Sequence, residues 1–185
     1  MKLGLVGSEM CIRDSNNRIL VAQGVARIRA GKARPGLLAL LSIAKRQHHN
    51  LQASDLGFSV GPRLNAAGRL DDMSLGIECL LSDNEKIATQ LAQELDELNA
   101  QRRHIEADMQ LQASNILALL ETSQDNQMPK CVCLYHPDWH QGVVGIVASR
   151  IKEKWHRPAL VFAKGDADTL KAVSYTHLTL PTKST

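Results

Sequence analysis

Apolar residues recur at gaps of three and four over residues 85–122, the spacing that places side chains on one face of an α-helix. The recurring positions are Ile87, Leu91, Leu95, Leu98, Ile105, Met109, Ile116 and Leu120. Ser82 and Glu85 stand three apart before this run, as in a capping box, so we expect the helix to begin there. At about 1.5 Å per residue, such a helix extends on the order of 55 Å. It therefore caps a bundle, forms a coiled coil or bridges two domains.

Two shorter helical patterns precede this run. Residues 18–31 place apolar side chains near helical spacing and end in Gly31, a residue type that commonly follows a helix. Residues 37–46 predict a short apolar helix that ends in Lys45 and Arg46, whose charges suit a helix C-terminus. The positions expected on its buried face are Leu37, Leu40, Leu41 and Ala44.

The hydrophobic pattern changes from helical to alternating at Cys131. The predicted elements are a strand over 131–135, a loop over 136–142, a helix over 143–155 and a second, parallel strand over 158–163. Together they make a βαβ unit, so the predicted fold class is α/β with a helix-rich first part. Cys131 and Cys133 stand at strand spacing, and we expect them to form a pair of small buried side chains.

The composition of the two ends differs from that of the rest of the chain. Four of the seven threonines fall within the last ten residues. We interpret residues 1–15 and 172–185 as adapter-like, non-native segments and exclude both from the fold. The alternative is that residues 173–180 form a genuine strand. In the first interpretation, the native part runs from residue 16 to residue 171.

Charge and residue usage narrow the function classes. The formal net charge of +3 is too small to indicate a nucleic-acid partner by itself, and an aromatic content of 3% argues against an aromatic base-stacking platform. The four cysteines show neither CxxC pairs nor a disulfide framework, which predicts reduced thiols in a cytoplasmic protein. No stretch reaches the roughly 18 apolar residues of a membrane span, so we expect no membrane partner.

The first motif with candidate chemistry is GPRLNAAGR at residues 61–69. Arg63 and Arg69 present planar guanidinium donors that match phosphate oxygens, and the small residues between them let a polyanion approach the backbone. The motif therefore predicts an anion site. The alternative, equally compatible with the spacing, is that both arginines pair with Asp71 and Asp72 in a solvated loop.

The second motif is WHQGVVGIVASR at residues 139–150, a loop that runs directly into a helix. Free N–H groups at a helix start favour an anion, and Gly142 and Gly145 carry no side chain that would obstruct it. His136 and His140 suggest a metal site. However, a proline between them keeps the segment out of a helix, so hydrogen-bonding loop histidines are the favoured interpretation.

Three segments, taken in order, resemble the RecJ family of the DHH phosphodiesterase superfamily. They are FSVGPRLNAAGRLDDMS, LAQELDELNAQRRHIE and YHPDWHQGVVGIVASRIKEKWHRPALVFA, and the likeness covers residues 16–171. It implies the C-terminal part of a DHH domain at 16–84, a long interdomain helix at 85–122 and the N-terminal part of a DHHA1 domain at 130–171. Single-stranded DNA is expected in the cleft between the two domains.

The resemblance implies a 5′-to-3′ single-stranded-DNA exonuclease of DNA repair and recombination that uses Mn²⁺ or Mg²⁺. The family's Asp-His-His metal ligands do not occur in these residues, so we expect no catalytic or metal residue here and no activity from the chain alone. The residues expected to bind substrate are Arg63, Asn65, Arg69, His140, Gln141 and Gly142. The alternatives are a DHH-family oligoribonuclease and a non-catalytic nucleic-acid-binding module.

Overall fold

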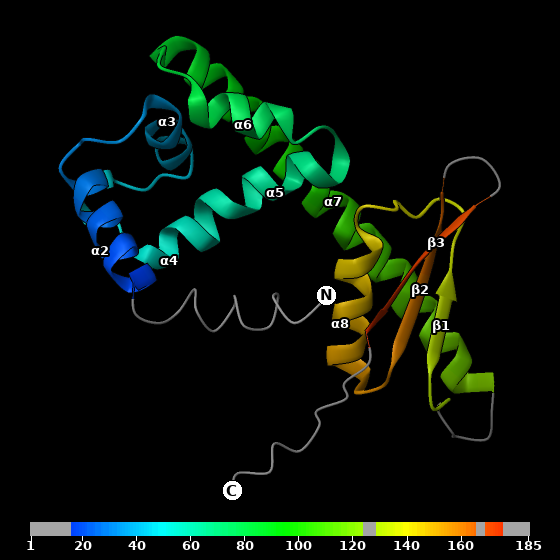
Figure 1. Cartoon of the computed structure of the whole chain (residues 1–185). Coiled ribbons are helices and arrows are strands. Elements are labelled where there is room, and N and C mark those ends of the chain that lie inside the picture. The colour runs from blue at the N-terminus through cyan, green and yellow to red at the C-terminus, as the bar shows by residue number, and fades with distance from the viewer. Residues whose placement is uncertain (1–15, 124–128, 166–168, 176–185) are drawn as a thin grey trace, which may run out of the picture. The chain divides into compact units, whose positions relative to one another are not determined.

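The chain divides into two compact units, and one helix is continuous across the boundary between them. A computed structural model describes residues 16–123, 129–165 and 169–175. We call Met1–Asn99 the helical unit and Ala100–Thr185 the sheet unit. Helix α7, Glu85–Ser123, has 39 residues and belongs to both units (Figure 1). The long helix predicted from the apolar spacing is therefore confirmed.

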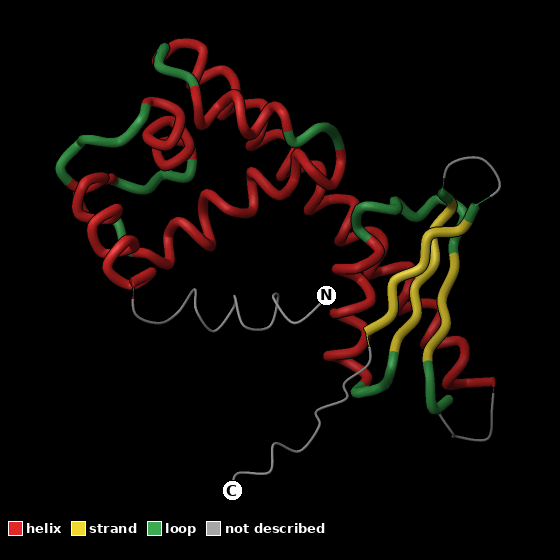
Figure 2. The backbone as a smooth tube through the Cα atoms, viewed as in Figure 1, coloured by secondary structure: helices red, strands yellow, loops and turns green. Residues whose placement is uncertain are grey.

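The helical unit consists of short helices packed with the first part of α7 (Figure 2). The elements are α2 (Asn16–Arg29), α3 (Pro35–Ile43), the 3-10 turn η1 (His48–Asn50), α4 (Ala53–Asp55), the π-helical turn η2 (Leu56–Val60), α5 (Gly61–Leu70) and α6 (Ser74–Leu81). Its core includes Leu40 and Leu41 of α3, as predicted, together with Leu51, Cys79 and Leu95. Leu37 and Ala44, expected on the same face, are only partly buried.

Helices α3 and α6 approach each other closely at Gly36. A Cβ atom on Gly36 would lie 1.8 Å from the carbonyl oxygen of Cys79, a backbone atom of α6. The predicted helix over residues 37–46 therefore begins two residues earlier, at Pro35, and Gly36 in its first turn provides the contact surface. Pro35 suits the start of a helix because its missing N–H would have no helical partner there.

The start of α7 is capped by Asn84 and not by Ser82. The side-chain oxygen of Asn84 accepts hydrogen bonds from the N–H groups of Lys86 at 2.9 Å and Ile87 at 3.3 Å. Ser82 instead exchanges hydrogen bonds with the backbone of Asn84. The predicted capping box was therefore wrong, although the predicted first helical residue, Glu85, is correct.

Replacing Asn84 by alanine should lower the free energy of unfolding by about 1 kcal/mol, because two N–H groups of α7 lose their acceptor. Urea denaturation followed by circular dichroism measures the change. The matched control is Ser82→Ala, which leaves the acceptor of α7 in place and should cost less. A larger loss in Ser82→Ala than in Asn84→Ala would contradict the assignment of the cap.

Small residues make up much of the buried face of α7. In the helical unit its buried apolar positions are Ala88, Ala92 and Leu95, and in the sheet unit they are Met109, Ala113 and Leu117. Ile87, which the apolar spacing placed on the buried face, is 45% exposed. Alanine is only weakly apolar, and the predicted buried face was built from large side chains. The prediction therefore placed the start of that face at Ile87, whereas it begins one residue later, at Ala88.

The sheet unit contains three strands, β1 (Val132–Tyr135), β2 (Ala159–Lys164) and β3 (Leu170–Tyr175). The strand order is β1-β2-β3; β1 and β2 are parallel, and β3 is antiparallel to β2. Helix α8 (Val144–Trp155) connects β1 to β2 and packs on β2 and β3 (Figure 1). The predicted βαβ unit, and with it the α/β fold class, is confirmed.

Strand β3 was not part of the favoured interpretation of the sequence. It includes residues 172–175, which that interpretation placed in an adapter-like tail. The alternative strand over 173–180 overlaps it in part, and residues 176–180 lie outside the described part of the chain. All six of its residues pair with β2, from Ala159↔Tyr175 to Lys164↔Leu170.

The two faces of the sheet differ in burial. Val132, Leu134 and Val161 are buried on one face, whereas Cys133 and Tyr135 are exposed on the other. The prediction that Cys131 and Cys133 form a buried pair was therefore wrong: both residues are exposed, since Cys133 lies on the exposed face of β1 and Cys131 precedes the strand. Local desolvation, followed by the neighbouring Cys133 thiol, raises the pKa of Cys131.

Candidate functional site

The first motif forms a helix, α5, and this separates its two arginines. Arg63, Ala66 and Ala67 lie on the buried face of α5, whereas Asn65 and Arg69, four positions apart, are exposed together. Six helical residues turn the chain by roughly 600°, so the two guanidinium groups leave the helix in directions about 120° apart. The expected pair of phosphate ligands is thus divided between a buried face and an exposed face.

Arg63 holds α5 against α7. Its side chain is 10% exposed, and its Nη2 atom lies 2.7 Å from Oδ1 of Asp96 on α7. Nη1 donates a hydrogen bond to the carbonyl oxygen of Ser59 in η2, while the buried Nε atom has no hydrogen-bond partner among the described residues. The ion pair neutralises Arg63 and accounts for its burial without a phosphate ligand.

The carboxylates proposed as alternative partners for the arginines do not pair with Arg63. Asp72 instead accepts a hydrogen bond from the N–H group of Ser74 at the start of α6. That hydrogen bond favours the ionised carboxylate and lowers the pKa of Asp72. The actual partner is Asp96. The signal that the sequence offered for it is its place next to Leu95, one of the recurring apolar positions of the predicted long helix.

The second motif forms the β1–α8 loop, which is anchored to the second half of α7. Trp139 is buried, and its indole N–H donates a hydrogen bond to Oε1 of Gln112 at 2.8 Å. This contact fixes the middle of the loop within the sheet unit. The next three residues, His140, Gln141 and Gly142, are partly buried.

His140 accepts hydrogen bonds from three consecutive N–H groups at the junction between the loop and α8. Its carbonyl oxygen accepts from the N–H groups of Val143 and Val144, and its Nδ1 atom accepts from the N–H group of Gly142 at 3.1 Å. These three N–H groups, which the sequence suggested for an anion, are therefore engaged internally, and those of Ile146 and Val147 donate to the carbonyl oxygen of Val143. Because Nδ1 is an acceptor, the neutral ring carries its proton on Nε2, which remains a hydrogen-bond donor.

The other conspicuous residues of this motif have local roles. Gly145 faces β3, where an added Cβ would lie 3.7 Å from Val173, an ordinary packing distance. His136 accepts a hydrogen bond from the N–H group of Asp138 through Nδ1. Gln141 places its Oε1 atom in a buried position without a hydrogen-bond partner among the described residues.

Residues 16–123, 129–165 and 169–175 hold no group of three or more His, Cys, Asp or Glu side chains arranged for a metal ion. His48 and His49 lie in the 3-10 turn η1, and both are exposed. No helix in the described part of the chain is long and apolar enough to cross a membrane.

Comparison with known proteins identifies consistent relatives, although no family model matches the chain. The chain is 58% identical over 158 residues to the single-stranded-DNA-specific exonuclease RecJ of Escherichia coli (strain K12), an alignment that covers 85% of the chain and 27% of that protein. The RecJ of Dickeya dadantii is 57% identical over 158 residues, an alignment that also covers 85% of this chain and 27% of that protein.

Solved structures agree with the sequence comparison. The crystal structure of RecJ in complex with Mg²⁺ from Thermus thermophilus superposes with a TM-score of 0.66 at 36% identity, covering 80% of this chain and 22% of that one. A structure of exonuclease RecJ bound to manganese gives a TM-score of 0.67, covering 80% of this chain and 36% of that one.

The chain spans about a quarter of the length of the curated relatives that it matches, since 27% of the Escherichia coli protein is aligned. Each of the two solved structures matches 80% of this chain, which consists of a helix-rich section and a small mixed sheet. The resemblance inferred from the three motifs is thereby confirmed, and the chain is related to a segment of the RecJ single-stranded-DNA-specific exonucleases.

Proposed function

We propose that this chain is part of a single-stranded-DNA exonuclease and that its role in that enzyme is to hold the DNA strand. The observation that supports the proposal is 58% identity over 158 residues to a protein with that activity. We further propose that the complete enzyme degrades its substrate from the 5′ end in the cytoplasm, with Mn²⁺ or Mg²⁺ as cofactor, since solved relatives bind both ions.

The described residues offer no cluster of three or more metal-ligating side chains, so we assign the metal ligands to other parts of the enzyme. The metal there activates water and neutralises charge on the phosphate. This division leaves binding and orientation of the strand to the present chain.

Within this proposal the exposed face of α5 binds phosphate through Arg69, and the side-chain amide of Asn65 donates a further hydrogen bond to the phosphate. His140 contributes the Nε2–H donor described above, while Gln141 and Gly142 shape the loop around it. Arg63 supports binding indirectly, because its ion pair with Asp96 fixes the orientation of α5 on α7.

A chimera tests the proposed function. The 158 aligned residues of Escherichia coli RecJ are replaced by those of this chain, and digestion of 5′-phosphorylated single-stranded and duplex DNA is measured with Mn²⁺. We expect the chimera to digest the single strand and to spare the duplex. Preference for short oligoribonucleotides would favour the oligoribonuclease alternative, and strand binding without digestion would favour a non-catalytic module.

In the same chimera, Arg69→Ala should weaken binding of single-stranded DNA and flatten its dependence on salt. Each lost phosphate contact reduces the slope of log K against log salt by about 0.7 for a single strand. Fluorescence anisotropy at several NaCl concentrations measures the slope. Lys86→Ala, which removes one exposed charge from α7, is the control. An unchanged slope in Arg69→Ala would exclude a phosphate contact at this position.

A further inference from the structure

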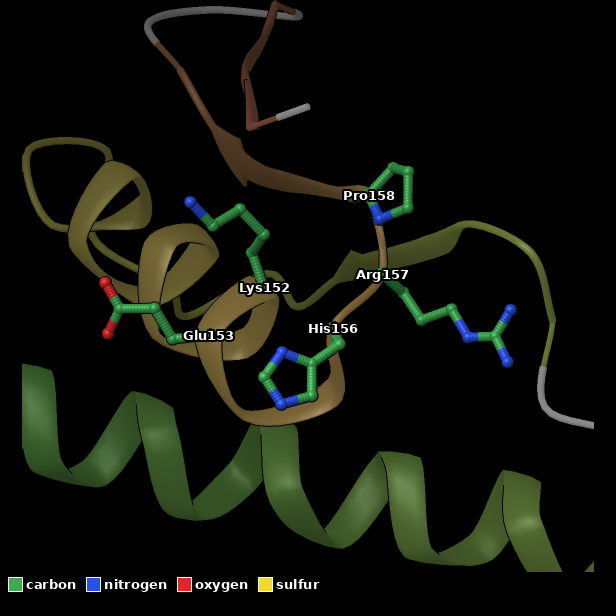
Figure 3. A pocket seen from close by; sticks show the side chains of 5 residues that line it. All are labelled: Lys152, Glu153, His156, Arg157 and Pro158. Atoms are coloured by element: carbon green, nitrogen blue, oxygen red, sulfur yellow. The ribbon is translucent and has the colours of Figure 1, made fainter. Parts of the chain in front are cut away.

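A basic hollow lies at the C-terminal end of α8, at the opposite end of this helix from the His140 loop. Its volume is about 510 Å³, and its lining residues are Lys152, Glu153, His156, Arg157 and Pro158. Figure 3 shows Lys152 and Glu153 on the end of α8, His156 just beyond it, and Arg157 and Pro158 on the segment that leads into β2. All five residues belong to the sheet unit, so the hollow is formed within one compact body.

The one carboxylate of the hollow already has cationic and hydroxyl partners. Oε2 of Glu153 lies 3.5 Å from Nη1 of Arg150, and the Ser149 hydroxyl donates to Oε1 at 3.4 Å. In contrast, no carboxylate in the described part of the chain forms an ion pair with His156 or Arg157. The hollow therefore presents positive charge that its own residues do not neutralise.

The helix dipole opposes an anion at this place, because a helix C-terminus carries about half a negative charge. The formal charges around it are larger. Lys152, Lys154 and Arg157 supply three positive charges against the single carboxylate of Glu153. The balance at the end of α8 remains positive even with a neutral His156.

The conformation of His156 offers a way to separate binding from stability. His156 follows α8 in the left-handed region, with φ 50 and ψ 39, and its N–H group donates to the carbonyl oxygen of Lys152 at 2.9 Å. Glycine is the usual residue at such a helix end, because other residue types are strained there. A glycine at position 156 would thus keep or improve the helix end while removing the imidazole from the hollow.

We propose that this hollow binds phosphate groups of a nucleic-acid strand, as an anion site separate from the α5 face and the His140 loop. Arg157 supplies the planar guanidinium donors that suit phosphate oxygens. Lys152 and His156 also line the hollow, and their side chains point in directions different from that of Arg157 (Figure 3). The twelve residues of α8 separate the hollow from the His140 loop by about 18 Å along the helix. The proposal depends on charge and shape alone and does not require the exonuclease function.

The test measures binding of the complete 185-residue chain to a fluorescein-labelled single-stranded oligodeoxynucleotide by anisotropy, at several NaCl concentrations. Arg157→Ala should weaken binding about two- to fivefold and flatten the salt slope by about 0.7. His156→Gly should also weaken binding while its melting temperature stays equal or rises. Arg103→Ala, which removes one exposed charge from α7, is the matched control and should have little effect.

Two results would overturn the proposal. The first is an unchanged affinity and salt slope in both Arg157→Ala and His156→Gly, with circular dichroism showing that both variants are folded. The second is that millimolar inorganic phosphate displaces the labelled strand completely and that the affinity for the strand does not depend on the NaCl concentration. This result would indicate a site for a free phosphate ion. Neither result bears on digestion by the chimera, so failure here and failure of the exonuclease assignment can be told apart.

Discussion

Replacing Gly36 by alanine should destabilise the helical unit by about 3 kcal/mol or more. The added Cβ would lie 1.8 Å from the carbonyl oxygen of Cys79 and 2.7 Å from its carbonyl carbon. Both are backbone atoms, which cannot rotate away as a flexible side chain can. Overpacking a core typically costs about 1–3 kcal/mol, and here two helices must separate, so we expect the upper end of that range or beyond. Urea denaturation measures the loss.

The matched control is Gly24→Ala in α2, where no atom lies within 4 Å of the added Cβ. Because glycine weakens a helix interior, this variant should gain about 0.5–1 kcal/mol. The same chemical change thus has opposite signs at two helical glycines. Equal stability of Gly36→Ala and the parent chain would show that α3 and α6 do not pack at the distance described here.

Asp96→Asn should destabilise the helical unit by about 2 kcal/mol, because it leaves the guanidinium of Arg63 without a counter-charge. Loss of one partner from a fully buried ion pair costs about 3–5 kcal/mol. The Asp96 side chain is 40% exposed, whereas that of Arg63 is 10% exposed, so solvent reduces the loss. The free energy of unfolding from urea titration gives the value.

The neighbouring variant Glu97→Gln removes a charge from an exposed position of α7 and should change stability by less than about 0.5 kcal/mol. A double-mutant cycle with Arg63→Met isolates the pair: the second substitution should add little once the first is made. Additive losses would show that Arg63 and Asp96 act independently. Arg63 would then be available to a phosphate after all.

The parts of the fold predicted from the sequence are those with long, regular periodicity. The helix α7 repeats its apolar spacing over many turns, and the βαβ unit combines two alternating segments with a helical one. Helix α5 was not recognised, since Gly61, Pro62 and Gly68 are residue types typical of turns. In the structure Gly61 and Pro62 occupy the first positions of the helix, where a proline is tolerated.

The candidate site was less predictable, because its side chains depend on partners distant in the sequence. Arg63 was expected to contact phosphate from its residue type and spacing, yet its surroundings are set by Asp96, 33 positions further along the chain. An ion pair between residues so far apart in the sequence can be predicted only when the helical face on which Asp96 lies is taken into account. His140 shows the opposite case, since its hydrogen bonds stay within four residues and a turn-forming role could be inferred locally.

The regular spacing of the buried residues of α7 inside the sheet unit has a geometric consequence. Met109, Ala113 and Leu117 follow one another at intervals of four residues. Each helical residue turns the chain by about 100°, so inserting one residue between Ala113 and Leu117 would turn Leu117 about 100° away from the face on which Met109 and Ala113 are buried. A change of length inside this stretch should therefore destabilise the sheet unit, whatever residue is inserted.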